Sequence, residues 1–305
     1  MASTKEIKNR INSVKDTQKI TNAMYLIAST KLRKARRELE ETKPYFHAVE
    51  TEIKRLFRIS NKLESVYFYP PSGERDLPGA YGYLVITADK GLAGSYNQSV
   101  IRKAEEMMAG HEDNRLFVVG EYGRHYFDMH HIPIEKSFLY TAQNPTFHRA
   151  REIRDILLEE FLEQKLRKIF IIYTDYGNGL MTDVKVARIL PFHRSNFITP
   201  AVEKKIENEF EFRPSMEQAL NHIVPSYLAG YIFSALVDSF CSEQSARMNA
   251  MDSANQNAEK LLSELSMQYQ HARQAAITRE ITEIAAGARA KKRAMKRQNR
   301  AGGTE

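Results

Sequence analysis

The sequence predicts an α/β sandwich domain inserted between two long terminal helices that pair as an antiparallel two-helix coiled coil. Apolar or small residues recur at alternating steps of three and four near both ends of the chain. Glycine is absent before Gly73 and between Gly230 and Gly287, so nothing interrupts a helix there. In the middle region, short apolar runs alternate with helical patterns, as in α/β folds.

The C-terminal helix is expected over residues 214–290. At about 1.5 Å per residue, its longest part would extend on the order of 100 Å. A helix of that length must pair with another long helix or lie inside a partner. Pro214 and Ser215 predict a short first helix, and Pro225 marks the predicted start of the long one. The predicted seam consists of Phe240, Arg247 as a polar exception, Met251, Ala254, Ala258, Leu261, Leu265, Ala272 and Ala276.

The N-terminal helix is expected over residues 1–66. Ser3 and Glu6 have the spacing of a capping box, which predicts the start of the helix. Pro44 is expected to kink it. The residues with helical spacing are Ile7, Ile11, Val14, Gln18, Thr21, Met24 or Tyr25, Ala28, Leu32, Ala35 and Leu39.

The middle domain is expected over residues 67–213, after a turn-forming cluster at residues 69–73. Helices are predicted at residues 100–108 and 149–166. Strands are predicted at residues 83–87, 116–119, 168–173 and 184–190, with a possible edge strand at 210–212. Residues 291–305 form a basic, low-complexity tail that is predicted to be disordered.

Composition narrows the class of protein. The chain has 305 residues and a formal net charge of +7, concentrated near its two ends. Cys241 is its one cysteine, which excludes an intramolecular disulfide and fits a reducing compartment. No window approaches eighteen consecutive apolar residues, so no membrane-spanning helix is predicted. The N-terminal residues lack the apolar core of a secretory signal.

No reaction centre is visible in the sequence. The turn from Gly91 to Gly94 follows the first strand, where a phosphate loop would lie, but the dinucleotide fingerprint and the P-loop motif are missing. A tight turn is the simpler interpretation, although Asp89 and Lys90 could in principle be catalytic. The nine histidines lack metal-ligand spacing, and no nucleophile elbow is present. We therefore expect no catalytic, cofactor-binding or metal site.

Two basic features leave an alternative open. The tail is basic, and a second group of cations lies on the first helix. A solvated helix face is the default interpretation of the helical group, with an acidic protein partner or nucleic acid as the alternative. For the whole chain, an α/β enzyme with coiled-coil arms and a basic coiled-coil nucleic-acid binder remain as rival functions. The helical group comprises Lys31, Arg33, Lys34, Arg36 and Arg37.

Three motifs carry a family resemblance. Residues 5–24 read KEIKNRINSVKDTQKITNAM and residues 28–32 read ASTKL. Residues 82–97 read GYLVITADKGLAGSYN. Near the C-terminus, residues 242–251 read SEQSARMNAM and residues 273–284 read RQAAITREITEI. In this order, and over nearly the whole chain, the sequence resembles the gamma subunit of F-type ATP synthases.

The resemblance implies a non-catalytic rotor. The paired helices would form a central shaft inside a ring of alternating alpha and beta catalytic subunits. The α/β domain would form a foot that rests, with the epsilon subunit, on the membrane c-ring. Ion flow would turn the shaft and couple to ATP synthesis or hydrolysis. The resemblance implies a peripheral location on the cytoplasmic side of a bacterial inner membrane, without cofactors and without nucleic acid. It does not distinguish protons from sodium ions.

The resemblance also implies which residues contact the catalytic ring. Single polar contacts on a surface contribute roughly 0.2–1 kcal/mol, so these side chains are expected to tune coupling while the whole shaft carries torque. Residues 291–305 extend beyond the usual family end, and the hypothesis is that they pass through the ring or contact acidic groups on its inner wall. The expected ring contacts are Met24, Arg247, Arg273, Gln274, Thr278 and Glu280.

Overall fold

The computed structural model describes residues 4–60, 63–70, 73, 74, 76–139, 142–177, 183–197 and 212–301. The chain divides into two compact units, one combining Met1–Tyr25 with Met251–Glu305 and the other comprising Leu26–Ala250. Two long helices, α1 (Thr4–Ile59) and α5 (Met216–Ala301), contribute residues to both units.

The first unit is an antiparallel helix pair, which confirms the predicted coiled coil. Gln18 Nε2 donates to Glu259 Oε1 at 3.5 Å, and Thr21 Oγ1 donates to Asn255 Oδ1. The α1 number rises as the α5 number falls, so the helices run in opposite directions. Leu265 and Ile7 are buried between them, at 3% and 8% exposed.

The predicted seam matches the burial pattern along both helices. In the first unit the seam residues of α1 from Ile7 to Met24 are buried or half-buried, whereas most of the residues between them are exposed. On α5 the same pattern holds from Met251 to Ala272. Ala276, predicted as the next seam position, is exposed. The pairing therefore ends near Ala272, about where α1 begins.

The second unit is a three-layer α/β domain with a five-stranded sheet in the order β3-β2-β1-β4-β5. The strands are β1 (Ala80–Ile86), β2 (Asn114–Val119), β3 (Ile134–Phe138), β4 (Leu166–Asp175) and β5 (Asp183–Leu190). The first four are parallel, and β5 runs antiparallel to β4. This arrangement confirms the predicted fold class.

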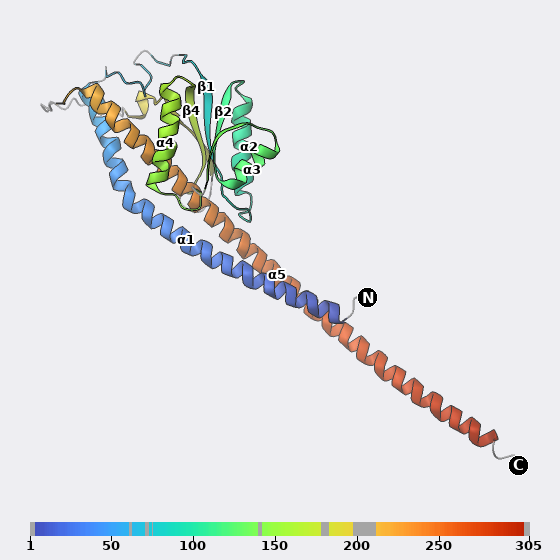
Figure 1. The fold of residues 1–305 in the computed structure, drawn as a ribbon. Coiled ribbons are helices and arrows are strands. Elements are labelled where there is room, and N and C mark those ends of the chain that lie inside the picture. The colour runs from blue at the N-terminus through green and yellow to red at the C-terminus, as the bar shows by residue number, and fades with distance from the viewer. Residues whose placement is uncertain are drawn as a thin grey trace. The chain divides into compact units, whose positions relative to one another are not determined.

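Helices cover both faces of the sheet (Figure 1). On one face lie α2 (Tyr96–Ala109) and α3 (Glu121–Met129), and on the other lie α4 (Phe147–Leu162) and the second-unit parts of α1 and α5. Strand β1 shows why both faces are apolar. Tyr83 and Val85 pack toward α2, whereas Leu84 and Ile86 pack on the opposite face, because successive side chains of a strand alternate. A short 3₁₀ helix, Arg194–Asn196, follows β5.

Helix α5 differs from the prediction at both ends. It begins at Met216 and passes through Pro225 without a break, so Pro225 does not mark its start. Its backbone also continues past residue 290 to Ala301, so residues 291–301 are helical where disorder was predicted. The proposed cap at Ser3 and two residues of the possible strand at 210–212 lie outside the described residues.

One part of α5 is apolar enough to resemble a membrane span. An 18-residue window reaches a mean hydropathy of 1.3, and 61% of that window is buried inside the protein. The sequence had predicted no membrane-spanning helix. Leu228, Ile232 and Leu236 pack on the sheet there, and Cys241 follows them as a fully buried residue. The burial is that of a core helix of the α/β domain.

Candidate functional site

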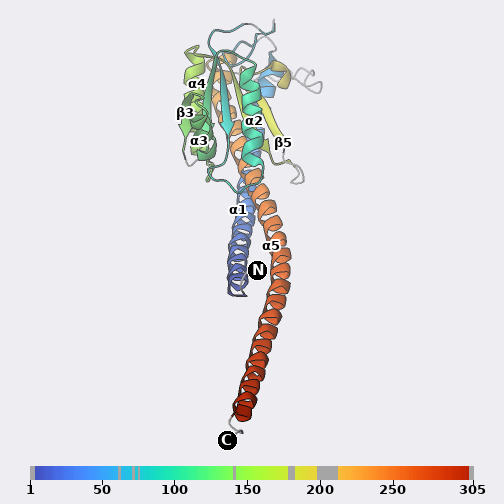
Figure 2. The same ribbon diagram turned by 90° about the vertical axis from the view of Figure 1, so that its right-hand side faces the viewer.

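The most exposed apolar surface of the first unit lies on α5 beyond Ala272. Every residue from Arg273 to Arg289 is exposed, and Ile277, Ile281 and Ile284 are 45%, 62% and 67% exposed. Figures 1 and 2 both show α5 continuing beyond the N-terminal end of α1. The isoleucines are spaced by four and three residues, so they form a single stripe. A lone helix with such a stripe is only marginally stable in water and has the character of an interaction surface.

Four of the predicted contact residues lie on this exposed segment. Arg273, Gln274, Thr278 and Glu280 are all exposed there. Arg273 and Glu280 share the helix face of Ile277, because their spacing is four and three. The structure thus brings charged and apolar groups together on one helical surface.

Met24 lies elsewhere in the first unit. It is half-buried in the seam, one turn from the hydrogen bond between Thr21 and Asn255. That position is separated from Arg273 by about twenty residues of α5, or roughly 30 Å. Met24 is therefore part of the paired rod and does not join the cluster around Arg273.

Arg247, the sixth expected ring contact, lies in the second unit and is largely buried. Its side chain is 12% exposed, and its Nη1 donates to the carbonyl oxygen of Gly91 at 2.9 Å. Its Nη2 pairs with Glu243, whose side chain is 9% exposed. The guanidinium therefore binds groups of the α/β domain itself.

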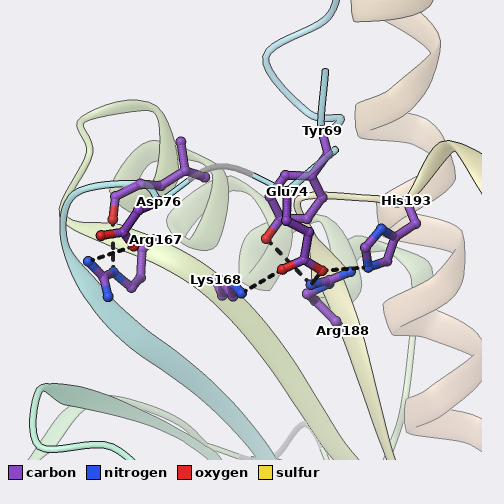
Figure 3. A network of polar contacts seen from close by, with 8 residues as sticks. Tyr69, Glu74, Asp76, Arg167, Lys168, Arg188 and His193 are labelled. Carbon is purple, nitrogen blue, oxygen red and sulfur yellow. Dashed lines mark hydrogen bonds and ion pairs between the residues drawn. The ribbon is translucent and has the colours of Figure 1, made fainter. Parts of the chain in front are cut away.

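A second polar cluster lies at the start of β4 and the end of β5 (Figure 3). The carboxylate of Glu74 accepts from Arg188 Nη1 at 2.9 Å and from Lys168 Nζ at 3.0 Å, with His193 Nε2 at 3.0 Å. Arg188 also lies over the ring of Tyr69, 4.9 Å from its centroid. These hydrogen bonds to Arg188 and Lys168 lower the pKa of Glu74 to about 2.

This cluster fixes the segment around Glu74 to the sheet. The residues labelled in Figure 3 do not form a catalytic arrangement of nucleophile and base. Glu74 precedes the sheet, whereas its cationic partners come from β4 and β5, 94 and 114 residues later. Sequence reasoning missed the cluster because no local motif connects groups so far apart. Beside it opens a pocket of about 340 Å³ that Asp76, Leu77, Phe161 and Pro191 help to line.

The Gly91–Gly94 turn has no phosphate-loop architecture. Asp89 uses Oδ1 to accept from the backbone N–H of Glu121 at 3.0 Å, so one carboxylate oxygen caps the start of α3. Within the described parts of the chain, no group of three His, Cys, Asp or Glu side chains could hold a metal ion. The geometry defines a protein built from a paired-helix rod and an α/β domain.

Comparisons with known proteins agree with this class. Residues 3–290 match the family model described as ATP synthase. The ATP synthase gamma chain of Acetivibrio thermocellus is 37% identical over 297 residues, covering 96% of this chain and 100% of the relative. A sodium-ion-specific ATP synthase gamma chain of Acetobacterium woodii is 34% identical, covering 93% and 97%.

Solved structures give the same result. A chain from the central stalk and c-ring structure of the Tetrahymena thermophila mitochondrial ATP synthase matches with a TM-score of 0.59 and 26% identity. The match covers 77% of this chain and 99% of the Tetrahymena chain. The chain therefore belongs to the ATP synthase gamma chain family.

Proposed function

We propose that this chain is the rotating central shaft of an F-type ATP synthase and contains no active site of its own. The exposed isoleucine stripe of α5 carries the proposal. A helical segment that exposes Ile277, Ile281 and Ile284, without a partner in the described structure, needs a surrounding protein surface to cover them. A socket formed by alpha and beta catalytic subunits would supply that surface.

The remaining partners follow from the family. The epsilon subunit and the membrane c-ring are the proposed partners of the α/β domain, and no nucleic acid is involved. In this arrangement, ion flow through the c-ring turns the shaft and drives ATP synthesis, or ATP hydrolysis turns it in reverse. The location is the cytoplasmic side of a bacterial inner membrane, as a peripheral subunit. Relatives with and without a sodium-specific name match, so the ion stays unassigned.

The proposed ring contacts are Arg273, Gln274, Thr278 and Glu280 on the free segment, with Met24 on the paired rod. Exposure of the first four supports this role. Each polar contact on such a surface contributes roughly 0.2–1 kcal/mol, so coupling should depend on the stripe and on helix shape more than on one side chain. Arg247 would act from within the α/β domain.

The test replaces the stripe. A chain carrying Ile277→Ser, Ile281→Ser and Ile284→Ser is co-expressed with the alpha, beta and epsilon subunits. We expect a folded chain by circular dichroism, and at least a tenfold loss of ATP-driven ion pumping in the assembled complex. Each fully covered isoleucine contributes about 1.5–3 kcal/mol, so three losses exceed that factor.

The matched control changes the opposite face of the same helix. Arg279→Ser, Glu283→Ser and Ala286→Ser introduce the same residue at the same spacing, and pumping should fall much less. Equal activity of the two triple variants would show that the stripe is not covered by the ring and would contradict the proposal.

The basic C-terminal residues are tested separately. Because α5 continues to Ala301, truncation after Ala290 removes a helical extension with several cations. If that extension contacts acidic groups of the ring, ATPase activity of the assembled complex should change and should become less sensitive to salt. Unchanged activity would indicate that the extension is idle.

A further inference from the structure

The α/β domain has a topological switch point between β1 and β4. The chain crosses from β1 to β2 and β3 on one side, and β4 then pairs with the other edge of β1. In open α/β sheets the crevice at the carboxyl ends of such strands is the usual ligand site. Here polar residues of α5, from Ser239 to Arg247, bond to the chain at that position.

On the β4 side, two serines of α5 satisfy the backbone at the end of the strand. Ser239 Oγ accepts from the N–H of Thr174 at 3.3 Å, and Ser242 Oγ donates to the carbonyl of Thr174 at 3.3 Å. Both serines are buried, at 2% and 0% exposed. The helix is thus bonded to the strand end in both directions.

On the β1 side, Arg247 bonds to the turn that follows the strand. Its Nη1 donates to the Gly91 carbonyl at 2.9 Å. Asn97 of α2 bonds to the same turn, accepting from the N–H of Ala88 at 2.9 Å and donating to the carbonyl of Lys90 at 3.4 Å. Leu92, which directly follows Gly91, has a φ of 62°. This backbone conformation is strained for a residue other than glycine, so the turn needs support from outside.

The pairing of Arg247 with Glu243 does not by itself explain why a charge is buried here. A buried ion pair can often be replaced by neutral groups of similar volume without loss of stability. The pair does orient the guanidinium, because one nitrogen binds Glu243 while another reaches Gly91. The hydrogen bond to the turn is what a neutral replacement would lose.

We propose that Arg247 is a positioning residue whose hydrogen bond to the Gly91 carbonyl fixes the 88–91 turn of the α/β domain to helix α5. Glu243 holds the guanidinium in the orientation that makes this bond. The bond adds a fixed point at the β1 end to the one that Ser239 and Ser242 make at β4. Load on α5 then passes directly to the centre of the sheet. The last statement rests on the proposed shaft function, whereas the bond and its effect on the turn do not.

The test removes the bond to the turn without leaving an unpaired buried charge. In the double variant Glu243→Gln with Arg247→Met, the glutamine keeps an acceptor for Gln244, and methionine fills the volume of the arginine stem without a donor. We expect the thermal unfolding midpoint to stay within a few degrees of the parent. Amide hydrogen exchange at residues 88–94 of the purified chain should accelerate at least tenfold.

A matched control removes a bond at the other strand. Ser242→Ala loses its bond to Thr174 and should leave exchange at 88–94 within twofold of the parent. If the double variant keeps the parent's exchange rates at these residues, the Arg247 bond does not fix the turn and the proposal is wrong.

A second measurement concerns load. In the assembled complex, the double variant should pump at least twofold fewer ions per ATP hydrolysed than the parent. Faster exchange with an unchanged pumping ratio would retain the positioning role and reject the load path. The exchange measurement uses the chain alone, so its outcome does not depend on whether the shaft function is correct.

Discussion

At Gly230, the backbone of α5 packs directly against a side chain of α1 in the α/β domain. A Cβ at this position would lie 2.1 Å from Cδ1 and 2.5 Å from Cε1 of Phe46. Phe46 is itself held between Phe147 and Phe233, with ring centroids 5.5 and 6.0 Å away. The ring therefore has little freedom to move aside, and the absence of a side chain at Gly230 permits the helix contact.

We predict that Gly230→Ala destabilises the chain by roughly 1–3 kcal/mol, because overpacking forces neighbouring groups out of place. Urea unfolding measures the change. Gly287→Ala is the control, since nothing lies within 4 Å of a Cβ there. Alanine at 287 should raise local helicity, by up to about 1 kcal/mol of helix propensity. A stabilising effect at both positions would show that the helices do not pack as described.

The buried carboxyl group of Asp238 should make the stability of the fold depend on pH. Burial, and then the charge of Asp175, raise the pKa of Asp238 to about 6, against the opposing effect of Lys43 and Lys185. Its ordinary value is 3.8, so between about pH 4 and 6 the folded chain binds a proton that the unfolded chain has released. This contribution to stability is present at low pH and is lost as pH rises through about 6.

We therefore expect Asp238→Asn to stabilise the chain at pH 7 by roughly 1–2 kcal/mol and to remove that part of the pH slope. Unfolding in urea at pH 4.5 and pH 7 measures both effects. Glu74→Gln should instead destabilise the chain at pH 7. The pKa of Glu74 is lowered to about 2, so its contribution is present above pH 4.5 and is lost on acidification. If the free energy of unfolding changes with pH equally in the parent and in Asp238→Asn, Asp238 is not the source of the pH dependence.

Single residues were predictable where a repeat specifies them. The seam of α1 follows from spacing alone, since burial recurs with the helix period. The bond from Arg247 to Gly91 was not predictable, because Gly91 lies 156 residues away and contributes only a backbone carbonyl. Backbone acceptors carry no sequence signal.

Among elements, α4 and α2 differ in how they begin. Thr146 caps α4, since its side chain accepts from the N–H of Arg149 at 3.3 Å. Ser95 occupies the same position before α2, but its side chain makes no cap hydrogen bond. Two residues with similar hydroxyl groups therefore have different energetic roles.

Thr146→Ala should lower the free energy of unfolding by about 1 kcal/mol, whereas Ser95→Ala should change it by much less. Thermal unfolding of the two variants in parallel provides the comparison. Equal losses would mean that the Thr146 bond contributes nothing beyond what any N-cap hydroxyl supplies.

Elements with strong periodicity were predicted, and weak ones were missed. Strand β3 was missed because its sequence, Ile-Glu-Lys-Ser-Phe, places polar residues on an edge strand. Helix α3 was missed because it is short and contains Gly123. Helix α4 ends at Leu162, before the predicted 166, since Gln164 adopts a φ of 60° that closes the helix. Local conformations of this kind leave little trace in hydrophobic spacing.

At the scale of the whole molecule, the two ends of the chain form one rod in the first unit. A direct test introduces Thr21→Cys and Asn255→Cys, the pair joined by a side-chain hydrogen bond. The native Cys241 should not interfere, because burial raises its pKa to about 12 and its side chain is inaccessible.

We expect a disulfide to form under mild oxidation, with ATP-driven ion pumping of the assembled complex retained to within about twofold. A shaft that turns as one body tolerates a covalent link between its two helices. Failure of the bond to form would contradict the antiparallel register, and loss of pumping after bonding would show that the helices must slide past each other.

The paired-helix architecture could be predicted because both long helices carry a regular spacing of apolar residues in the sequence. The exact extent of α5 was not, since a basic, small-residue composition does not distinguish a helix from a disordered end. Whether such a segment is helical also depends on the surfaces of other chains that cover it, and the sequence of this chain does not describe those surfaces.

The separation of the paired residues has a consequence for biosynthesis. Thr21 and Asn255 are 234 positions apart, with the entire α/β domain between them. During translation, the apolar seam of α1 emerges first and its complement emerges last. The nascent chain must therefore keep an unpaired hydrophobic helix in solution while the sheet folds, which makes the early ribosome-bound chain a natural client for molecular chaperones.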